Sequence, residues 1–163
     1  MYELRGMTCN RIIVLAAGRA TRMRTSAASV EQTHFAQDAL ERPKPMIRVG
    51  PNGEPMLELI LEQALRAGFT EATVVIAPND TITLAFLQEW EGRGLGMRVQ
   101  TAVQPDPKGT GHAVQCALES DPVLSGAMWV LANGDNLPTR SALSRLRTEG
   151  AGPAVLALSL IHI

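Results

Sequence analysis

The sequence predicts a single α/β domain with a mostly parallel sheet and helices on both faces. Short apolar runs, which suit strands buried on both faces, alternate along the chain with segments of helical apolar spacing. This alternation favours parallel pairing, because a crossover helix carries the chain back to the starting edge of the sheet. A length of 163 residues and a hydrophobic fraction of 45% suit one packed domain and exclude intrinsic disorder.

The elements of the first half have recognisable boundaries. The apolar run IIVLAA predicts a strand over 12–17. After it, only Val30–Leu40 suits a short helix, inside an inserted loop. Helical spacing in PMLELILEQALRAGF predicts a helix over 55–69, since proline is tolerated in a first turn and Gly68 suits a C-terminal stop. A further apolar run, ATVVIA, predicts a strand over 72–77.

The second half repeats the alternation. Residues 81–91 are predicted to form a helix, and residues 97–103 the next strand. TGHAVQCALE predicts a helix over 110–119, and the strongly apolar AMWVLA predicts a strand over 127–132. The pattern ends with two further predicted elements, a polar helix over 139–148 and a strand over 154–160.

Positive charge is concentrated near the N-terminus, although the formal net charge is only -1. Residues 1–50 contain eight Lys and Arg against four Asp and Glu, whereas residues 51–163 contain seven against twelve. A near-neutral chain with one basic cluster suits a small polyanion, and it excludes a nucleic-acid partner bound by bulk electrostatics. A solvated basic face is the alternative interpretation of the cluster.

Cysteine content and hydropathy indicate a cytoplasmic location. Cys9 and Cys116 are too few for a disulfide framework or a zinc site, which suits a reducing compartment. No apolar run approaches the roughly 20 residues of a membrane helix, so no membrane partner is expected. Residues 1–10 lack a signal-peptide hydrophobic region and are predicted to be an N-terminal extension.

Two loops near the N-terminus contain residues suited to binding phosphate. In Ala16–Arg24, AAGRATRMR, small residues let backbone N–H groups approach a ligand, and Arg22 adds a fixed positive fork. This loop matches neither G-x-G-x-x-G nor G-x-x-x-x-G-K-[ST], and a simple tight turn explains it equally well. In RPKPMIRV, two prolines restrict the backbone around Lys44, although a surface lysine in a proline-rich turn is the alternative.

Two later loops also follow predicted strands, where ligands of open α/β sheets bind. In QPDPKGTG, Gln104 offers a donor and an acceptor to a nucleobase edge, Gly109 permits close approach, and Thr110 is expected to cap the next helix. In NGDNLP, Asp135 suits Mg²⁺ because it follows a buried strand beside a glycine. The alternatives are an ordinary strand–turn–helix junction and an Asx turn.

Taken together, the four loops resemble those of the sugar-phosphate nucleotidyltransferases, the nucleoside-diphosphate-sugar pyrophosphorylases. The family motifs L-A-A-G-x-G-T-R-M and P-K-P correspond here to LAAGRATRM and RPKPM. The family's Q-x(n)-P-x-G-T-x-x-A is echoed by Gln104–Ala113, and its G-D by Gly134–Asp135. The resemblance covers about residues 11–157 and implies a three-layer Rossmann-like fold with an NTP-transferase domain.

The resemblance implies an enzyme that transfers a nucleotidyl group from an NTP to a sugar 1-phosphate, with Mg²⁺ as cofactor. The implied catalytic residues are Arg22, Lys44 and Asp135, with Asp135 as the metal ligand. The implied nucleotide-binding residues are Leu15, Ala16, Ala17, Gly18, Ala20, Thr21, Arg22, Gln104, Gly109 and Thr110. Two alternatives are a non-catalytic nucleotide-binding or regulatory module of this fold and a nucleotide-sugar-dependent glycosyltransferase. Neither has a triphosphate for Arg22 and Lys44 to neutralise.

Three departures from the family pattern qualify these expectations. Ala20 stands where the family has its second glycine, and the segment between Arg24 and Lys44 is longer than usual. The family's second metal-binding aspartate and its sugar-binding segment are not found, so 11–157 is expected to be the N-terminal part of the domain, incomplete at its C-terminus. Residues 158–163, LSLIHI, are expected to be a non-native tail. The expected partners are an NTP and a sugar 1-phosphate. The sequence leaves open whether the chain forms a homo-oligomer.

Overall fold

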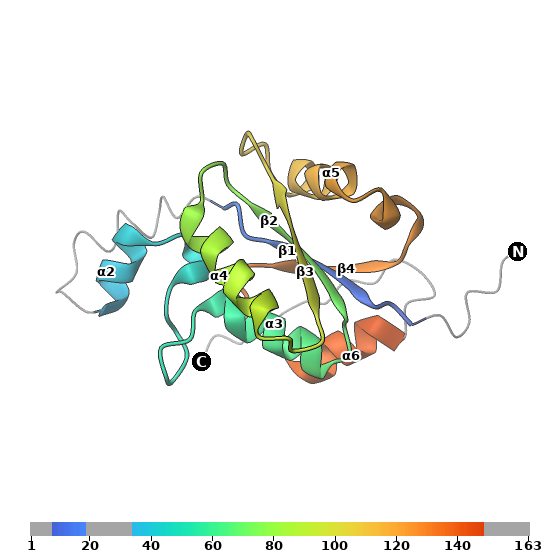
Figure 1. Cartoon of the computed structure of the whole chain (residues 1–163), viewed down its shortest axis with the longest axis horizontal. Helices are drawn as coiled ribbons and strands as arrows, with labels where there is room; N and C mark the ends of the chain where they lie inside the picture. The colour runs from blue at the N-terminus through green and yellow to red at the C-terminus, as the bar shows by residue number, and fades with distance from the viewer. Residues whose placement is uncertain (1–7, 19–33, 149–163) are drawn as a thin grey trace, which may run out of the picture.

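The computed structural model describes residues 8–18 and 34–148. Its centre is a parallel four-stranded sheet in the order β3–β2–β1–β4 (Figure 1). The strands are β1 (Arg11–Leu15), β2 (Glu71–Ile76), β3 (Arg98–Val103) and β4 (Trp129–Asn133). The helices are α2 (His34–Glu41), α3 (Met56–Arg66), α4 (Thr81–Gly92), α5 (Thr110–Ser120) and α6 (Arg140–Thr148), with short 3-10 turns η1 (Lys44–Met46) and η2 (Pro122–Gly126). The predicted fold class, a parallel sheet with helices, is confirmed.

Every predicted strand and helix that falls within the described residues forms, with ends shifted by a few residues. The segment Val30–Leu40, expected to contain a short helix, contributes to α2. Helix α3 follows Pro55, and Gly68, just beyond the helix, has the left-handed φ of +95° that a glycine tolerates best. The predicted strand at 154–160 and the predicted tail lie outside the described residues.

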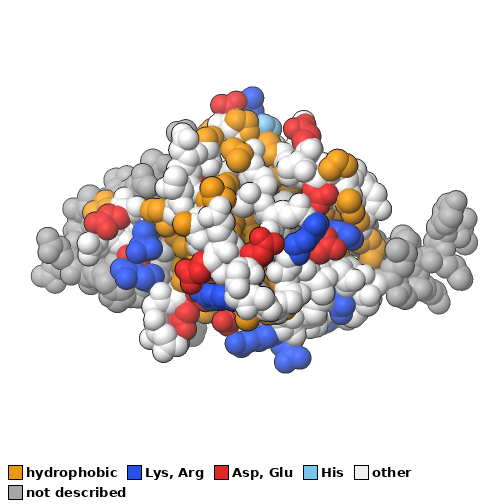
Figure 2. Space-filling model, viewed as in Figure 1, with side chains coloured by type: hydrophobic (Ala, Val, Ile, Leu, Met, Phe, Trp, Pro, Cys, Tyr) orange, Lys and Arg blue, Asp and Glu red, His pale blue; other side chains and the backbone are white. Residues whose placement is uncertain are grey.

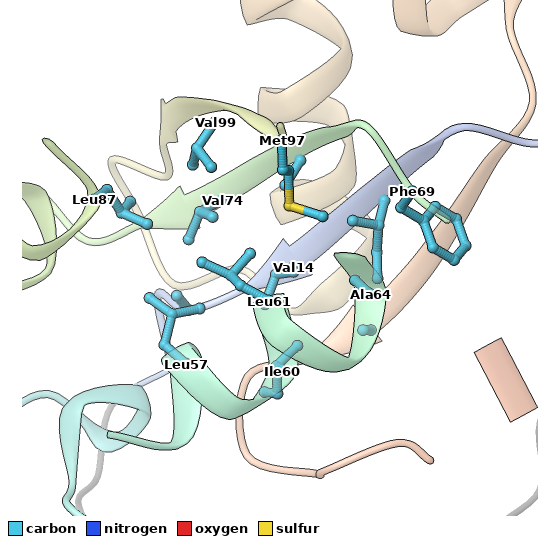
Figure 3. Close-up of a cluster of buried hydrophobic side chains, with 14 of the residues drawn as sticks. Val14, Leu57, Ile60, Leu61, Ala64, Phe69, Val74, Leu87, Met97 and Val99 are labelled. Atoms are coloured by element: carbon cyan, nitrogen blue, oxygen red, sulfur yellow. The ribbon is translucent and has the colours of Figure 1, made fainter. Parts of the chain in front are cut away.

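The two faces of the sheet carry separate cores, because alternate residues of a strand point to opposite faces. Ile12 and Val14 of β1 face a large core with α3, α4 and α6, whereas Ile13 faces a smaller core with α5. Figure 3 shows the large core, in which α3 contributes Leu57, Ile60, Leu61 and Ala64. Fully burying a leucine or isoleucine side chain stabilises the fold by about 1.5–3 kcal/mol.

The strand order places a topological switch point between β1 and β4. From β1 the chain moves outward to β2 and β3 through α3 and α4, then returns across the sheet through α5 to reach β4 on the other side of β1. Connections of one hand therefore place α3 and α4 on one face and α5 on the other. Ligands of open α/β sheets bind outside the carboxyl ends of the strands at this point.

The exposed face over α3 and α4 mixes charges of both signs, with acidic and basic side chains beside one another (Figure 2). Arg93, after α4, pairs with Glu58 of α3 and Glu89 of α4, and its guanidinium lies 5.6 Å from the ring centroid of Trp90. These contacts join the two helices. None of the helices in the described ranges is long and apolar enough to cross a membrane.

Candidate functional site

Two of the predicted site residues meet at the carboxyl end of the sheet. Lys44, in η1, places its Nζ 2.6 Å from Oδ2 of Asp135, which follows β4. The two side chains are 35% and 39% exposed, so solvent and small ligands can reach both. Exposed ion pairs stabilise a protein by at most about 1 kcal/mol, so this pair can be exchanged for other charged partners at little cost.

Gly134 brings three segments of the site into contact. Its N–H donates to the Leu15 carbonyl at 2.9 Å, which continues the parallel pairing of Leu15 with Asn133. A Cβ at Gly134 would lie 2.6 Å from the Leu15 carbonyl oxygen and 3.2 Å from Cγ of Pro45. The end of β1, the P-K-P segment and the G-D turn are therefore packed too closely for any side chain at this position.

The loop after β1 is partly anchored to the sheet. The Ala16 N–H donates to the Val75 carbonyl at 2.8 Å, and the side chains of Ala16 and Ala17 are buried. Gly18 is exposed, and a Cβ there would meet nothing within 4 Å. Leu15 is partly buried at the end of β1. The remaining predicted nucleotide-binding residues of this loop, Ala20, Thr21 and Arg22, lie outside the described residues.

Gln104, at the end of β3, is held in a network of hydrogen bonds. Its backbone N–H donates to the Ile76 carbonyl at 2.9 Å, and its side chain is only 7% exposed. Its amide nitrogen donates to the Gly109 carbonyl at 3.1 Å and lies 3.2 Å from Nδ1 of His112. The bond to Gly109 fixes the amide nitrogen, and Nδ1 of His112 accepts a second amide hydrogen only in the tautomer that does not donate to the Asp106 carbonyl.

Thr110 does not cap α5, and that expectation was wrong. The N-cap is Gly109, which has a φ of 92° and makes no side-chain capping bond, whereas Thr110 is the first helical residue. A cap residue needs non-helical backbone angles, and here the glycine adopts them one position earlier.

His112 is the residue in this region whose role the sequence did not reveal. It lies on the first turn of α5, and its ring contacts three parts of this region. Nδ1 lies 3.0 Å from the Asp106 carbonyl as well as 3.2 Å from the Gln104 amide nitrogen, and Nε2 lies 3.8 Å from Sγ of Cys116. His112 thus lies against both the Gln104 amide and the Asp106 carbonyl, and Nδ1 bonds to one of the two at a time, according to the tautomer of the ring. Cys116 is buried.

The carboxylate at the switch point suits a metal ion that is already bound to the phosphates of a nucleotide. Within the described residues no group of three or more His, Cys, Asp or Glu could hold a metal ion. Asp135 is an accessible carboxylate at the switch point, with its side chain 39% exposed. Mg²⁺ usually binds proteins through one or two carboxylates, with water and substrate phosphates completing its coordination. A single carboxylate therefore fits a phosphate-bound Mg²⁺ and does not fit a cage made by the protein.

Comparison with known proteins identifies the family. A family model described as the MobA-like NTP transferase domain matches residues 12–159. The chain belongs to this family. The match spans β2, β3 and β4, β1 from its second residue, and both the P-K-P and G-D segments. It confirms the resemblance to sugar-phosphate nucleotidyltransferases, and the domain limits at 11 and 157 stay predictions.

Curated relatives and solved structures agree with this MobA-like assignment. The bifunctional protein GlmU of Sorangium cellulosum is 32% identical over 148 residues, which cover 90% of this chain and 28% of GlmU. GlmU of Trichlorobacter lovleyi is 33% identical over 156 residues, which cover 94% of this chain and 29% of that protein. The chain thus spans under a third of the length of these relatives.

Among solved structures, UDP-glucose pyrophosphorylase in complex with UDP-glucose matches with a TM-score of 0.63 and 17% identity, over 86% of this chain and 53% of that one. The UTP-bound enzyme of Acinetobacter baumannii matches with a TM-score of 0.60 and 21% identity, over 86% of this chain and 52% of that one. At these identities the two matches confirm the three-layer Rossmann-like nucleotidyltransferase fold.

Proposed function

We propose that this domain transfers a nucleotidyl group from an NTP to a sugar 1-phosphate and releases pyrophosphate. The observation that carries the proposal is the meeting of Lys44 and Asp135, at 2.6 Å, beside the switch point of a MobA-like NTP transferase fold. A metal-bound triphosphate presents negative phosphate oxygens and a positive metal ion. Lys44 and Asp135 offer the opposite charges beside one another at this place.

In the proposed reaction, an oxygen of the sugar phosphate attacks the α-phosphorus of the NTP. A new P–O bond forms, the bond between the α-phosphorus and the α,β-bridging oxygen breaks, and pyrophosphate leaves with the bonding electrons. No protein nucleophile is needed, because the attacking phosphate is already ionised at neutral pH. Catalysis then consists of positioning and charge stabilisation.

Lys44 is proposed to hold phosphate oxygens of the NTP. Its backbone is restrained by Pro43 and Pro45 and by burial of the next residue, Met46, so the side chain has less freedom to lose when it binds. The ammonium has the Asp135 carboxylate as its partner. We therefore expect Lys44 to turn from Asp135 toward the phosphates when nucleotide binds.

Asp135 is proposed to hold Mg²⁺ that arrives with the NTP. When bound, the ion would neutralise charge on the phosphate oxygens. Gly134, packed against the Leu15 carbonyl, fixes the backbone from which Asp135 projects. Once Lys44 leaves, both oxygens of the Asp135 carboxylate become available as hard ligands.

The nucleobase is proposed to lie near the loop of Gln104 and the open Gly18. The amide oxygen of Gln104 is proposed as the acceptor, because the amide nitrogen donates to the Gly109 carbonyl. Arg22 is proposed to add positive charge beside the phosphates. Since the two solved relatives are described as bound to UTP and UDP-glucose, UTP with glucose 1-phosphate is the first substrate pair to test.

The test is pyrophosphate release by this chain with each NTP and a panel of sugar 1-phosphates, at saturating Mg²⁺. Lys44→Met should lower kcat by about 10²–10³, the loss typical of one preorganised charge. Arg66→Met is the matched control, since Arg66 is an exposed cation paired with Glu62 at the far end of α3. Nucleotide binding without pyrophosphate release would contradict the proposed activity and support a non-catalytic module. Hydrolysis or transfer from a nucleotide-sugar would support a glycosyltransferase.

A further inference from the structure

A buried carboxylate lies behind the segment that carries Lys44. Asp38, on α2, is only 1% exposed. Its Oδ2 accepts from the backbone N–H and Nε of Arg48, at 3.0 and 2.9 Å, and its Oδ1 accepts from Nη2 of the same residue at 2.7 Å. Nε of Arg42 lies 3.3 Å from Oδ1. One carboxylate thus engages two arginines.

These two arginines stand at the two ends of the P-K-P segment. Arg42 immediately precedes Pro43, and Arg48 follows the buried pair Met46 and Ile47. Asp38 also accepts the Arg42 N–H through its backbone carbonyl, at 2.8 Å. Through these contacts a single residue ties together both ends of the loop from which Lys44 reaches Asp135.

We propose that Asp38 is a positioning residue for Lys44: by clamping Arg42 and Arg48, it fixes the loop so that the Lys44 ammonium stays beside Asp135. Asp38 contacts both arginines whatever reaction the domain catalyses. Its kinetic consequence rests on the proposed function.

The charges of this clamp, formed by Asp38, Arg42 and Arg48, suit a positioning role. The Arg48 guanidinium holds the pKa of the Asp38 carboxyl down at about 2, so the clamp stays ionised at neutral pH. The Arg48 side chain is 43% exposed, so it can reach water if Asp38 loses its charge. Asp38→Asn therefore loosens the loop without leaving a buried unpaired charge, and the fold is expected to survive.

A chemical test can follow Lys44 directly, because the chain contains only two lysines, Lys44 and Lys108. Limited acetylation of the native protein, quantified by peptide mass spectrometry, gives the ratio of the two modification rates. Lys108 is an internal reference, since it is exposed and lies 3.4 Å from Asp106 in another loop. We expect Asp38→Asn to raise the Lys44 to Lys108 ratio several-fold by freeing the ammonium from Asp135.

Two further variants keep this test decisive. Arg48→Lys retains the charge but cannot make the bidentate contact, and it should raise the ratio in the same direction. Glu58→Gln breaks a comparable arginine contact, with Arg93, between α3 and α4, and it should leave the ratio unchanged. A ratio unaltered in both Asp38→Asn and Arg48→Lys would overturn the proposal, as would an equal rise in Glu58→Gln.

The kinetic test is a double-mutant cycle between Asp38→Asn and Lys44→Met. If Asp38 acts through Lys44, Asp38→Asn should lower kcat about tenfold with KM little changed, the loss typical of an outer supporting residue. It should then cost nothing further in the Lys44→Met background. Additive losses would overturn the positioning role. Absence of turnover in the unmodified chain would count against the proposed function, while the acetylation ratio still decides the geometric inference.

Discussion

Lys44 and Asp135 stand 91 positions apart in the sequence, yet their charged atoms lie 2.6 Å from each other at the carboxyl end of the sheet. Each side chain is the ion-pair partner of the other. An anion that binds Lys44 and a cation that binds Asp135 both compete with this ion pair. The two ligands should therefore assist one another, because each binding event frees the group that the other needs.

The first prediction concerns cation binding in the absence of nucleotide. Lys44→Met removes the ammonium that competes for Asp135, so the affinity of the chain for Mn²⁺, used as a probe for Mg²⁺, should rise. An exposed pair contributes at most about 1 kcal/mol, which corresponds to a rise of up to about fivefold. Titration of Mn²⁺ followed by electron paramagnetic resonance measures it. Arg66→Met serves as control, and an affinity equal to that of the unmodified chain would refute the competition.

The second prediction concerns the charge of Asp135. Asp135→Asn preserves side-chain size, and turns accept Asn as readily as Asp, so stability should change by less than about 0.5 kcal/mol. Turnover should nevertheless fall steeply and require much more Mg²⁺, because a hard cation prefers carboxylate oxygen. Rates measured against Mg²⁺ concentration test this, with Glu62→Gln on α3 as control. Superimposable curves for Asp135→Asn and the unmodified chain would remove Asp135 as the metal ligand.

The third prediction concerns the packing at Gly134. Gly134→Ala forces a methyl group against the Leu15 carbonyl, where the Cβ would lie 2.6 Å from the oxygen. The strain should lower the free energy of unfolding by about 1–3 kcal/mol, seen as a lower urea midpoint with an unchanged slope. Gly92→Ala is the matched control, since a Cβ there meets nothing within 4 Å and alanine favours a helix. An equal effect of the two substitutions would show that no close contact exists at Gly134.

The fourth prediction concerns acid. The pKa of Asp38 is lowered from 3.8 to about 2, chiefly by hydrogen bonds from the Arg48 side chain. A lowered pKa stabilises the folded state by about 2 kcal/mol above the unfolded pKa, and this contribution disappears as pH falls through the folded value. The difference in unfolding free energy between the unmodified chain and Asp38→Asn should thus be constant above about pH 5 and shrink between about pH 4 and pH 2. A difference that does not vary with pH would show that Asp38 is not ion-paired in solution.

The fold was predictable because its strands are short apolar runs with little ambiguity. IIVLAA and ATVVIA could be assigned without knowledge of their neighbours, and their burial on both faces followed from composition. The order of the strands was not predicted, although it determines which loops meet. It depends on which face each helix covers, a property of whole-chain packing.

Lys44 and Asp135 were each predicted from their own loop, but their contact was not. Asp135 directly follows a strand, so its place at the sheet edge was foreseeable. Lys44 follows no strand, and its approach depends on the docking of α2 through Asp38 and Arg48, which no local pattern indicates. The role of His112 was missed for a similar reason, since it depends on the direction of one ring toward the Gln104 amide.

The smaller of the two cores has a consequence for the position of the Gln104 loop. Where α5 faces the sheet it contributes Ala113 and Ala117, the smallest side chains that still exclude water, against Ile13, Val75 and Ala102. This thin apolar layer sets the height of α5 above the sheet, and with it the height of the helix's first turn and His112. One added methyl group at Ala117 would lift the helix and reposition the Gln104 loop. The position of the Gln104 loop is thus set from beneath, by the residues of the smaller core.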